Sequence, residues 1–421
     1  MCKEIVIILG GIKMKKLVLT LPFLFLANLA LASGFGLYEF SARGNAMGGA
    51  VMAGEAEPAS LAMNPALITE LPGKQIQTGI TVVTATGGEQ YGPFVGESKR
   101  QWWPLPNLYY TQQINDRWWL GLGAMARFGL SNDYKNENWM FAAGTSLKHV
   151  GVTTFSIQPT VAFKATDRLS VSLGAEVQYL NFTEKIRFND GGNPADLNLD
   201  GDSYALSGIA AMYYQANEKV NMGISFRMRN DHSVRGPNKY DRETTNYQGG
   251  GDFWGDITFP AQLAIGVSYR PIEKLLIEAN WTNVFWSCFR AVDIYFDSVP
   301  GNPGTPGLMG THQGNMKHYQ DSYRVGIGAE YTLTDAVKLR GSFIYDKSPL
   351  NDEFMDAMLP VDDRYIIGTG AGFKLSENTI LDLSYSILFA TSLDGVAANG
   401  TPVHYKSATS HLMGLSFRYK F

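Results

Sequence analysis

The last residues of the chain alternate strictly between two kinds of side chain. Large apolar residues occupy every second position from Met413 to Phe421, and glycine, serine, arginine and lysine stand between them. This two-residue period predicts an extended strand whose two faces meet different surroundings. A half-buried strand of a soluble protein would show the same alternation, so other segments must decide between the two classes of protein.

The alternation recurs in residues 169–179, 259–270 and 323–333. Each segment is long enough for the roughly 9–11 residues that a tilted membrane strand needs. Its charged side chains fall on the face that carries glycine, serine and glutamine. Because a charged side chain facing lipid costs about 2–4 kcal/mol at the middle of the bilayer, this placement favours an all-β transmembrane barrel with a polar lumen over a soluble sandwich.

Residues 1–32 have the features of a signal peptide for export. A lysine-rich patch precedes the largely apolar residues 17–31, and residues 30–32 offer the small-x-small pattern of a cleavage site. The apolar run is short for a spanning helix of about 20 residues, and no apolar stretch beyond residue 33 reaches that length. We expect translation to start at Met14 and the mature chain to start at Ser33.

Composition excludes several classes of function. Removal of the signal peptide leaves Cys288 as the one cysteine, so neither an internal disulfide nor a cysteine-rich metal site can form. The net charge of -4 offers no basic surface for nucleic acid. We therefore expect no metal, no cofactor and no nucleic-acid partner, and a monomer surrounded by outer-membrane lipids and lipopolysaccharide.

Short and long connections follow one another along the chain, which gives about fourteen antiparallel strands, an even number as in bacterial barrels. Tight polar turns are expected near 115–116, 166–167, 217–218, 271–272, 334–335 and 376–377. Long loops are expected near 87–104, 129–150, 183–202, 230–256, 298–320, 348–361 and 392–405. Short turns belong in the periplasm, so both chain ends should lie there. A terminal aromatic residue, here Phe421, resembles the signal by which the barrel-assembly machinery recognises its substrates.

Residues 33–73 do not follow the strand pattern. They are rich in glycine and alanine, and they also carry Phe35, Leu37, Tyr38 and Phe40. Apolar side chains of this size are costly to leave in water. We therefore expect these residues to form a hatch folded into the lumen rather than a disordered tail, with the barrel in residues 74–421.

Three groups of motifs resemble the long-chain fatty-acid transporters of the FadL type. The sequence Gly34-Phe35-Gly36-Leu37-Tyr38-Glu39-Phe40-Ser41 is similar to the start of that family's hatch. Asn64-Pro65-Ala66 matches a motif of the same hatch. Segments at 321–326, 339–341, 345–349 and 363–364 follow the family's strand pattern in order and spacing. Together they cover essentially the whole mature chain.

The resemblance implies a passive transporter for hydrophobic molecules in the outer membrane. The ligand would bind in an extracellular groove, move to an apolar pocket in the lumen, and leave sideways through a kink in the barrel wall after the hatch rearranges. Long-chain fatty acids are the leading substrate, and aromatic hydrocarbons are the alternative within the family. An outer-membrane lipid hydrolase is the alternative of another class, although neither Gly-x-Ser-x-Gly nor His-Glu-x-x-His occurs in the sequence. A general diffusion porin is not favoured, because an apolar plug would obstruct its aqueous pore.

The resemblance also assigns roles within the hatch. Phe35 would occupy the inner pocket and be displaced as the hatch moves, or it would simply pin the plug in place. Pro65 fixes its own φ and keeps Asn64 out of helical conformation, and Asn64 can bond nearby backbone. Asn64, Pro65 and Ala66 would then act at the lateral exit, or else form a structural turn.

A fatty-acid carboxylate needs a cation, and a guanidinium can pair with it in a bidentate manner. Arg187 stands where fatty-acid members of the family carry a basic residue, and Lys185 is its competitor. Arg364 is a further candidate, although a lumen arginine commonly belongs to an ion network. Gln320 stands where a lysine would suit a carboxylate, and Lys317 and His318 are near enough to replace it.

Two other patterns have simpler explanations. Residues 196–201 match the front half of a calcium-binding loop, but Ser207 stands where that loop needs a bidentate glutamate, which favours a solvated acidic loop. Trp286 and the tryptophan pairs at 102–103 and 118–119 are expected at the membrane interface, and some of them could instead line an apolar groove.

Overall fold

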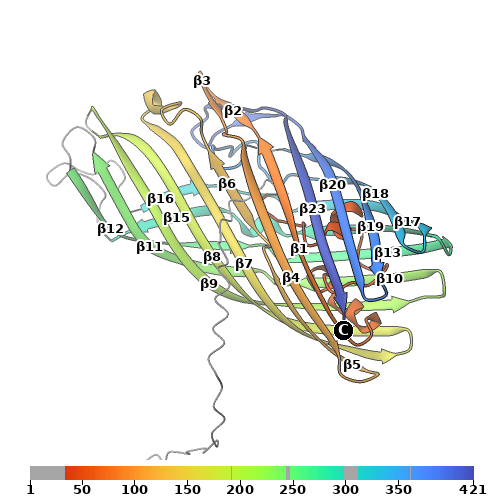
Figure 1. Cartoon of the computed structure of the whole chain (residues 1–421). Coiled ribbons are helices and arrows are strands. Elements are labelled where there is room, and N and C mark those ends of the chain that lie inside the picture. Colours follow the sequence, from red (N-terminus) through yellow and green to blue (C-terminus); the bar gives the residue numbers. More distant parts are fainter. Residues whose placement is uncertain (1–33, 191, 243–246, 298–311, 361) are drawn as a thin grey trace, which may run out of the picture.

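Antiparallel strands form one closed wall (Figure 1). The computed structural model describes residues 34–190, 192–242, 247–297, 312–360 and 362–421, so the expected signal peptide lies outside the described residues. Fourteen wall strands are present there, and strands β1 and β23 close the barrel by pairing from Gln75–Lys420 to Thr86–Thr409. Nine of the fourteen are uninterrupted: β1 (Lys74–Thr86), β4 (Gln101–Gln113), β7 (Thr145–Thr166), β8 (Leu169–Asp190), β9 (Asn193–Gln215), β18 (Val337–Asp346), β19 (Arg364–Ser376), β20 (Thr379–Ala390) and β23 (Ala408–Lys420).

The other five wall strands are each broken into two elements. In Figure 1 the elements β11, β12, β15 and β16 are found at the left of the barrel. The five broken strands are β5 (Trp118–Met125) with β6 (Gly129–Asp133), β10 (Val220–Arg227) with β11 (Asn230–Arg242), β12 (Tyr247–Phe259) with β13 (Gln262–Ile272), β14 (Leu275–Val284) with β15 (Ala291–Phe296), and β16 (His312–Met316) with β17 (Ser322–Thr334).

The two faces of the wall have opposite character. On the outer face Leu173 and Leu206 are 71% and 78% exposed, whereas on the lumen face Glu176 and Gln178 are fully buried. This arrangement inverts that of a soluble protein, because the outer face meets lipid and the polar side chains bond to one another in the interior.

Two of the expected long loops are largely strand. Residues 183–202 belong mostly to the β8–β9 hairpin, and residues 230–256 belong mostly to the β11–β12 hairpin. Their glycine and polar residues suggested loops, but hydrogen bonding between strands continues above the apolar band regardless of side-chain polarity. The fourteen-stranded wall itself is as predicted.

The N-terminal residues fill the lumen as a hatch, which appears red in Figure 1. Its helices are α1 (Ala42–Ala46), α2 (Ser60–Met63) and the 3-10 helix η1 (Pro65–Glu70); further 3-10 turns are η2 (Phe141–Ala143) and η3 (Trp286–Cys288). A separate small sheet covers the end of the barrel opposite the short turns, in the order β21 (Leu393–Val396), β22 (Pro402–Tyr405), β2 (Gly88–Tyr91) and β3 (Phe94–Glu97). None of the described helices is long and apolar enough to span a bilayer.

Candidate functional site

Wall glycines allow the hatch to lie directly on the lumen face. A Cβ at Gly223 would stand 2.1 Å from the Met52 carbonyl oxygen, and one at Gly266 would stand 2.4 Å from the Met52 Cβ. Larger residues at these positions would therefore push the hatch off the wall. The glycines that stand between the outward apolar residues are thus part of the surface on which the hatch packs.

Buried charges also attach the hatch to the wall. The Arg43 guanidinium of α1 lies 3.1 Å from Glu330 on β17, and Glu330 in turn pairs with Arg340 at 2.7 Å. Arg340 also pairs with Asp382 at 2.6 Å. Each of these four side chains is nearly inaccessible, so removal of one partner would leave an uncompensated buried charge.

Asn64, Pro65 and Ala66 form the start of η1. The Asn64 carboxamide oxygen accepts a hydrogen bond from the Ala66 N–H at 3.1 Å, with Pro65 at the first helical position. The Asn64 amide donates to the carbonyl oxygens of Met52, within the hatch, and Met212 on β9. The motif is therefore a helix cap that also ties the hatch to the wall.

The Phe35 ring lies in an aromatic pocket of the lumen. It packs edge to face against Trp286 at 4.9 Å between ring centroids, Phe289 at 5.2 Å and Phe259 at 5.8 Å, with Tyr319 at 6.4 Å. Phe35 is 1% exposed, and aromatic contacts of this geometry add to the free energy gained by burial.

The backbone on either side of Phe35 is paired with a kink in the wall. Residues 126–128 separate β5 from β6, and the Phe128 ring is buried against Phe259 at 4.3 Å. The Leu37 N–H donates to the Arg127 carbonyl oxygen at 2.8 Å, and the Gly129 N–H donates to the Phe35 carbonyl oxygen at 2.7 Å. The first residues of the hatch thus extend the wall inward at the kink.

The same kink leaves a gap in the wall between β4 and β6. Strand β4 pairs with β5 from Gln113 only as far as Leu108, and the two sides meet again where the Lys99 N–H donates to the Asp133 carbonyl oxygen. A groove of about 990 Å³ lies against this gap. Its lining includes Pro104, Leu105, Pro106 and Ala126 beside residues of β7, β8, β9 and β11.

Among the predicted cations, Lys317 is the buried one on the segment that carries the pocket residue Tyr319. It follows β16 and precedes the pocket residue Tyr319 by two positions, and it is 1% exposed. Its ammonium forms an ion pair with Asp356 and interacts electrostatically with Glu184 on β8. A carboxylate entering this part of the lumen would find a positive charge there, together with a competing carboxylate.

The other predicted cations lie elsewhere. Arg187 is on the outer face of β8, where its guanidinium donates two hydrogen bonds to Asp196 at 2.8 and 3.0 Å. Lys185 is exposed on the same face and lines the groove at the gap. His318 is exposed, with its ring against Phe354. Arg364 is buried in the lumen.

The Arg364 guanidinium is held in an ion network beside the hatch. It lies 2.6 Å from Asp346, which also pairs with Arg324 at 3.4 Å. Arg324 in turn stacks over the ring of the hatch residue Tyr38 at 4.4 Å. Arg364 therefore reaches the hatch only indirectly, through Asp346 and Arg324, whereas Arg43 pairs with the wall directly.

Trp286 is a pocket residue, and the sequence-based assignment to the membrane interface is wrong for it. It is fully buried, and it lies in the short η3 helix where β14 breaks from β15. The even-numbered residues Leu276 to Val284 of β14 face the lumen, and Trp286 continues this count past the end of the strand. Alternation along β14 was therefore the available signal, together with the clustering of Phe285, Trp286 and Phe289.

The acidic segment 196–201 is part of β9 rather than a loop. Asp196 is engaged by Arg187 and Lys148, and Asp200 accepts from Asn181 at 3.0 Å. No group of three or more potential metal-ligating side chains is found within the described part of the chain.

Comparison with known proteins connects this geometry to a family. The family model described as "Outer membrane protein transport protein (OMPP1/FadL/TodX)" matches residues 23–421. The chain belongs to this family. It is 21% identical to the long-chain fatty acid transport protein of Escherichia coli strain K12, across 94% of this chain and 96% of that protein.

Solved structures agree on the fold. A FadL homologue of Pseudomonas aeruginosa superposes with a TM-score of 0.81 at 16% identity, covering 92% of this chain and all of that one. The Pseudomonas putida toluene transporter TodX gives a TM-score of 0.72 at 17% identity, covering 93% of this chain and 99% of that one.

As a FadL/TodX family member, the chain is an outer-membrane transporter of hydrophobic compounds from a Gram-negative bacterium. The family's members are transporters rather than enzymes. The predicted family, barrel fold and cellular location are thereby confirmed.

Proposed function

We propose that this chain takes up long-chain fatty acids by passive movement through the aromatic pocket and out through the gap beside β4. The placement of Phe35 carries the proposal. Its ring fills the pocket, and its backbone is bonded to the kink that borders the gap.

Entry of a ligand tail into the pocket would compete with the Phe35 ring. Withdrawal of Phe35 would break the two backbone hydrogen bonds that join residues 35–37 to residues 127–129. The kink would then lose its inner partner strand and could move away from β4. A tail in the pocket would reach the groove of about 990 Å³ by this route without crossing the hatch.

The rest of the hatch stays attached in this scheme. Asn64 remains bonded to the wall at Met212, and Arg43 remains paired with Glu330. Because buried ion pairs are costly to separate, movement is confined to the residues ahead of α1. We assign Asn64, Pro65 and Ala66 this anchoring role, which sets the limit of the movement that opens the lateral exit.

The carboxylate of the fatty acid would pair with Lys317. This ammonium is buried beside the pocket, and its present partner Asp356 lies on the connection between β18 and β19 rather than on a wall strand. A ligand carboxylate can therefore replace Asp356 without disturbing the barrel. Arg187 would first have to release Asp196 and turn through the wall, so Lys317 is the better assignment.

A pair of ligands and a pair of variants test the assignment. We expect Lys317→Met to weaken binding of a long-chain fatty acid to the purified protein by roughly 10-fold to 100-fold, because a charge-assisted hydrogen bond contributes about 1.5–3 kcal/mol. The methyl ester of the same acid lacks the charge, and its affinity should not change. The matched control Arg187→Met should bind both ligands as the unmodified protein does.

Two results would overturn the fatty-acid assignment. In one, Arg187→Met rather than Lys317→Met weakens binding of the acid. In the other, the unmodified protein binds the acid and its methyl ester with equal affinity, so that no cation takes part in recognition. Equilibrium binding measured at one detergent concentration distinguishes these results from the expected one.

The aromatic lining of the pocket favours a second candidate, an aromatic hydrocarbon. Four rings surround the Phe35 ring, and a benzene derivative has the size and quadrupole of that ring. On this hypothesis toluene binds more tightly than the fatty acid, and Lys317→Met leaves the affinity for toluene unchanged. Competition between labelled toluene and the fatty acid decides between the two substrates.

A further inference from the structure

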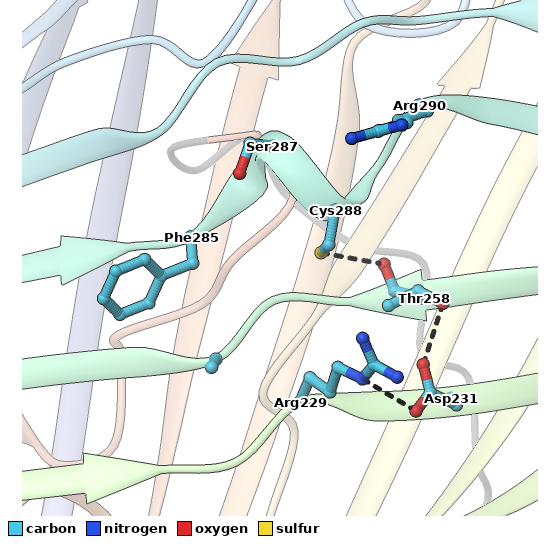
Figure 2. A pocket seen from close by; sticks show the side chains of 8 residues that line it. Arg229, Asp231, Thr258, Phe285, Ser287, Cys288 and Arg290 are labelled. Atoms are coloured by element: carbon cyan, nitrogen blue, oxygen red, sulfur yellow. Dashed lines mark hydrogen bonds and ion pairs between the residues drawn. The ribbon is translucent and has the colours of Figure 1, made fainter.

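Three neighbouring wall strands break at the same level of the barrel. The breaks lie at Met228–Arg229, at Pro260–Ala261 and at residues 285–290. Strand register places them side by side, because Arg227 pairs with Gln262 and Gln262 pairs with Val284. Together they leave a hollow of about 480 Å³ in the wall (Figure 2).

The hollow opens on the outer face rather than into the lumen. Arg229 and Asp231 are 63% and 56% exposed, whereas Asn230 between them is fully buried. Trp286 is likewise buried in the aromatic pocket, while the next residue, Ser287, is exposed and lines the hollow. The hollow is therefore separate from the path proposed for the transported ligand.

Two guanidinium groups lie at opposite ends of the hollow, with Thr258 and Cys288 between them (Figure 2). The Arg229 Nε donates to Asp231 at 3.0 Å, and the Thr258 hydroxyl donates to the other Asp231 oxygen at 2.9 Å. This chain of bonds fixes the Arg229 side chain and leaves its terminal nitrogens available.

The second guanidinium is not neutralised in the same way. Arg290 is exposed and forms no ion pair with any described residue. Asp321 lies at the rim, where it accepts a hydrogen bond from the Ser287 N–H at 2.9 Å. With Asp321 counted, two guanidinium groups face two carboxylates, and Arg290 is the guanidinium that no described carboxylate engages, so it is the group that an anionic ligand would meet.

The depth of the hollow in the membrane follows from β13. Its outward residues run from Tyr269, beside a short turn, to Ala261 in the lining of the hollow. Eight residue steps of about 3.3 Å in a strand tilted by about 40° rise roughly 20 Å along the membrane normal, close to the full apolar band. The arginines therefore stand at the depth of the outer-leaflet headgroups, with Phe285 and Ala261 at their base.

We propose that this hollow binds a phosphate group of an outer-leaflet glycolipid, that is, the lipid A part of lipopolysaccharide. Guanidinium groups recognise phosphate oxygens in a bidentate manner. The depth of the hollow in the membrane indicates that the phosphate belongs to a lipid, because the apolar base of the hollow meets acyl chains directly below the phosphate. The site depends on the outer-membrane location and not on which substrate the barrel transports.

Binding of lipid A to the intact, purified barrel in detergent tests the site. We expect the double variant Arg229→Gln, Arg290→Gln to bind lipid A at least about tenfold more weakly. The control Arg117→Gln, Arg168→Gln removes the same charge from exposed short turns at the other end and should bind lipid A normally. Lipid A from which both phosphates have been removed should bind the unmodified protein as weakly as intact lipid A binds the double variant.

Three results would overturn the proposal. The double variant binds lipid A as tightly as the control does; or dephosphorylated lipid A binds as tightly as intact lipid A; or inorganic phosphate displaces lipid A at equal concentration, which would indicate a site for free phosphate. Because all four substituted arginines are exposed on the surface, both variants can be compared as folded barrels by their thermal unfolding.

Discussion

On the proposed route, single side chains divide the hatch into a fixed part and a releasable part. Arg43 and Asn64 hold the fixed part through a buried ion pair and two backbone carbonyl oxygens. Phe35 holds the first residues mainly by aromatic packing. A hydrophobic ligand can replace packing of this kind with contacts of its own, but it cannot replace a buried ion pair. Ligand binding should therefore act on Phe35 alone.

Phe35→Ala tests whether the Phe35 ring competes with the ligand for the pocket or only holds the hatch in place. The substitution removes packing of about 3–5 kcal/mol and empties the space that a ligand would enter. We expect tighter binding of a small aromatic ligand, measured by equilibrium binding to the purified protein. Leu37→Ala also truncates a buried hatch residue, but one outside the aromatic pocket, and it should leave the affinity unchanged. Equal affinities of Phe35→Ala and the unmodified protein would mean that Phe35 only pins the hatch.

The cations show what the sequence could and could not reveal. Glu176 and Gln178 mark the even positions of β8 as the lumen face, so the same count places Arg187 on the outer face. The polar residues and glycines of the segment predict a loop, however, and a loop has no such count. Lys317 follows a break between two strands, where no period applies. Its surroundings include Asp356 and Glu184, which only the folded chain brings near it.

Among the secondary-structure elements, the broken strands carry the residues of the proposed route. The β5–β6 break borders the gap, and the β14–β15 break places Trp286 in the pocket. Alternation predicted the wall strands because one face of each is apolar over its whole span. It did not reveal the breaks by any one signature, because the buried face stays on even-numbered residues across the β14–β15 break but moves from odd- to even-numbered residues across the β10–β11 break.

A disulfide across the kink tests the coupling between hatch and gap. Gly36 of the hatch and Phe128 of the kink form an isolated antiparallel β-bridge. The double variant Gly36→Cys, Phe128→Cys should form a disulfide that holds residues 35–37 against the wall. We expect uptake of fatty acid into reconstituted vesicles to stop when this variant is oxidised and to resume after reduction. The reduced form of the same preparation serves as the control. The variant also carries Cys288→Ser, in both the oxidised and the reduced state.

Persistent uptake in the oxidised state would contradict the lateral route, because the hatch could not then have left the kink. Complete formation of the disulfide is checked by loss of free thiol before transport is measured. Uptake that fails in both redox states would point to the loss of the Phe128 ring, and the single variant Phe128→Ala identifies that case.

At its outer end the molecule is closed by a cover, which consists of the small sheet β21-β22-β2-β3 and the connection 348–360. The Tyr134 hydroxyl joins these two parts. The Tyr134 hydroxyl lies 2.7 Å from Glu89 of β2 and 2.8 Å from the Ala357 carbonyl oxygen. A hydroxyl donates one hydrogen, so both contacts are satisfied only when Glu89 is protonated and donates to Tyr134. Burial raises the pKa of Glu89 to about 8, and Glu89 forms no ion pair with the described residues.

The cover should therefore loosen in alkali. Since the folded pKa of Glu89 lies above its ordinary value of about 4.3, its stabilising contribution is complete below that value and is lost as pH rises through about 8. We expect protease cleavage within residues 348–360 of the purified barrel to accelerate between pH 7 and pH 9, relative to a short turn of the same protein. In Glu89→Gln the amide donates to Tyr134 at every pH, so this acceleration should vanish. An equal acceleration in Glu89→Gln would show that another group controls the cover.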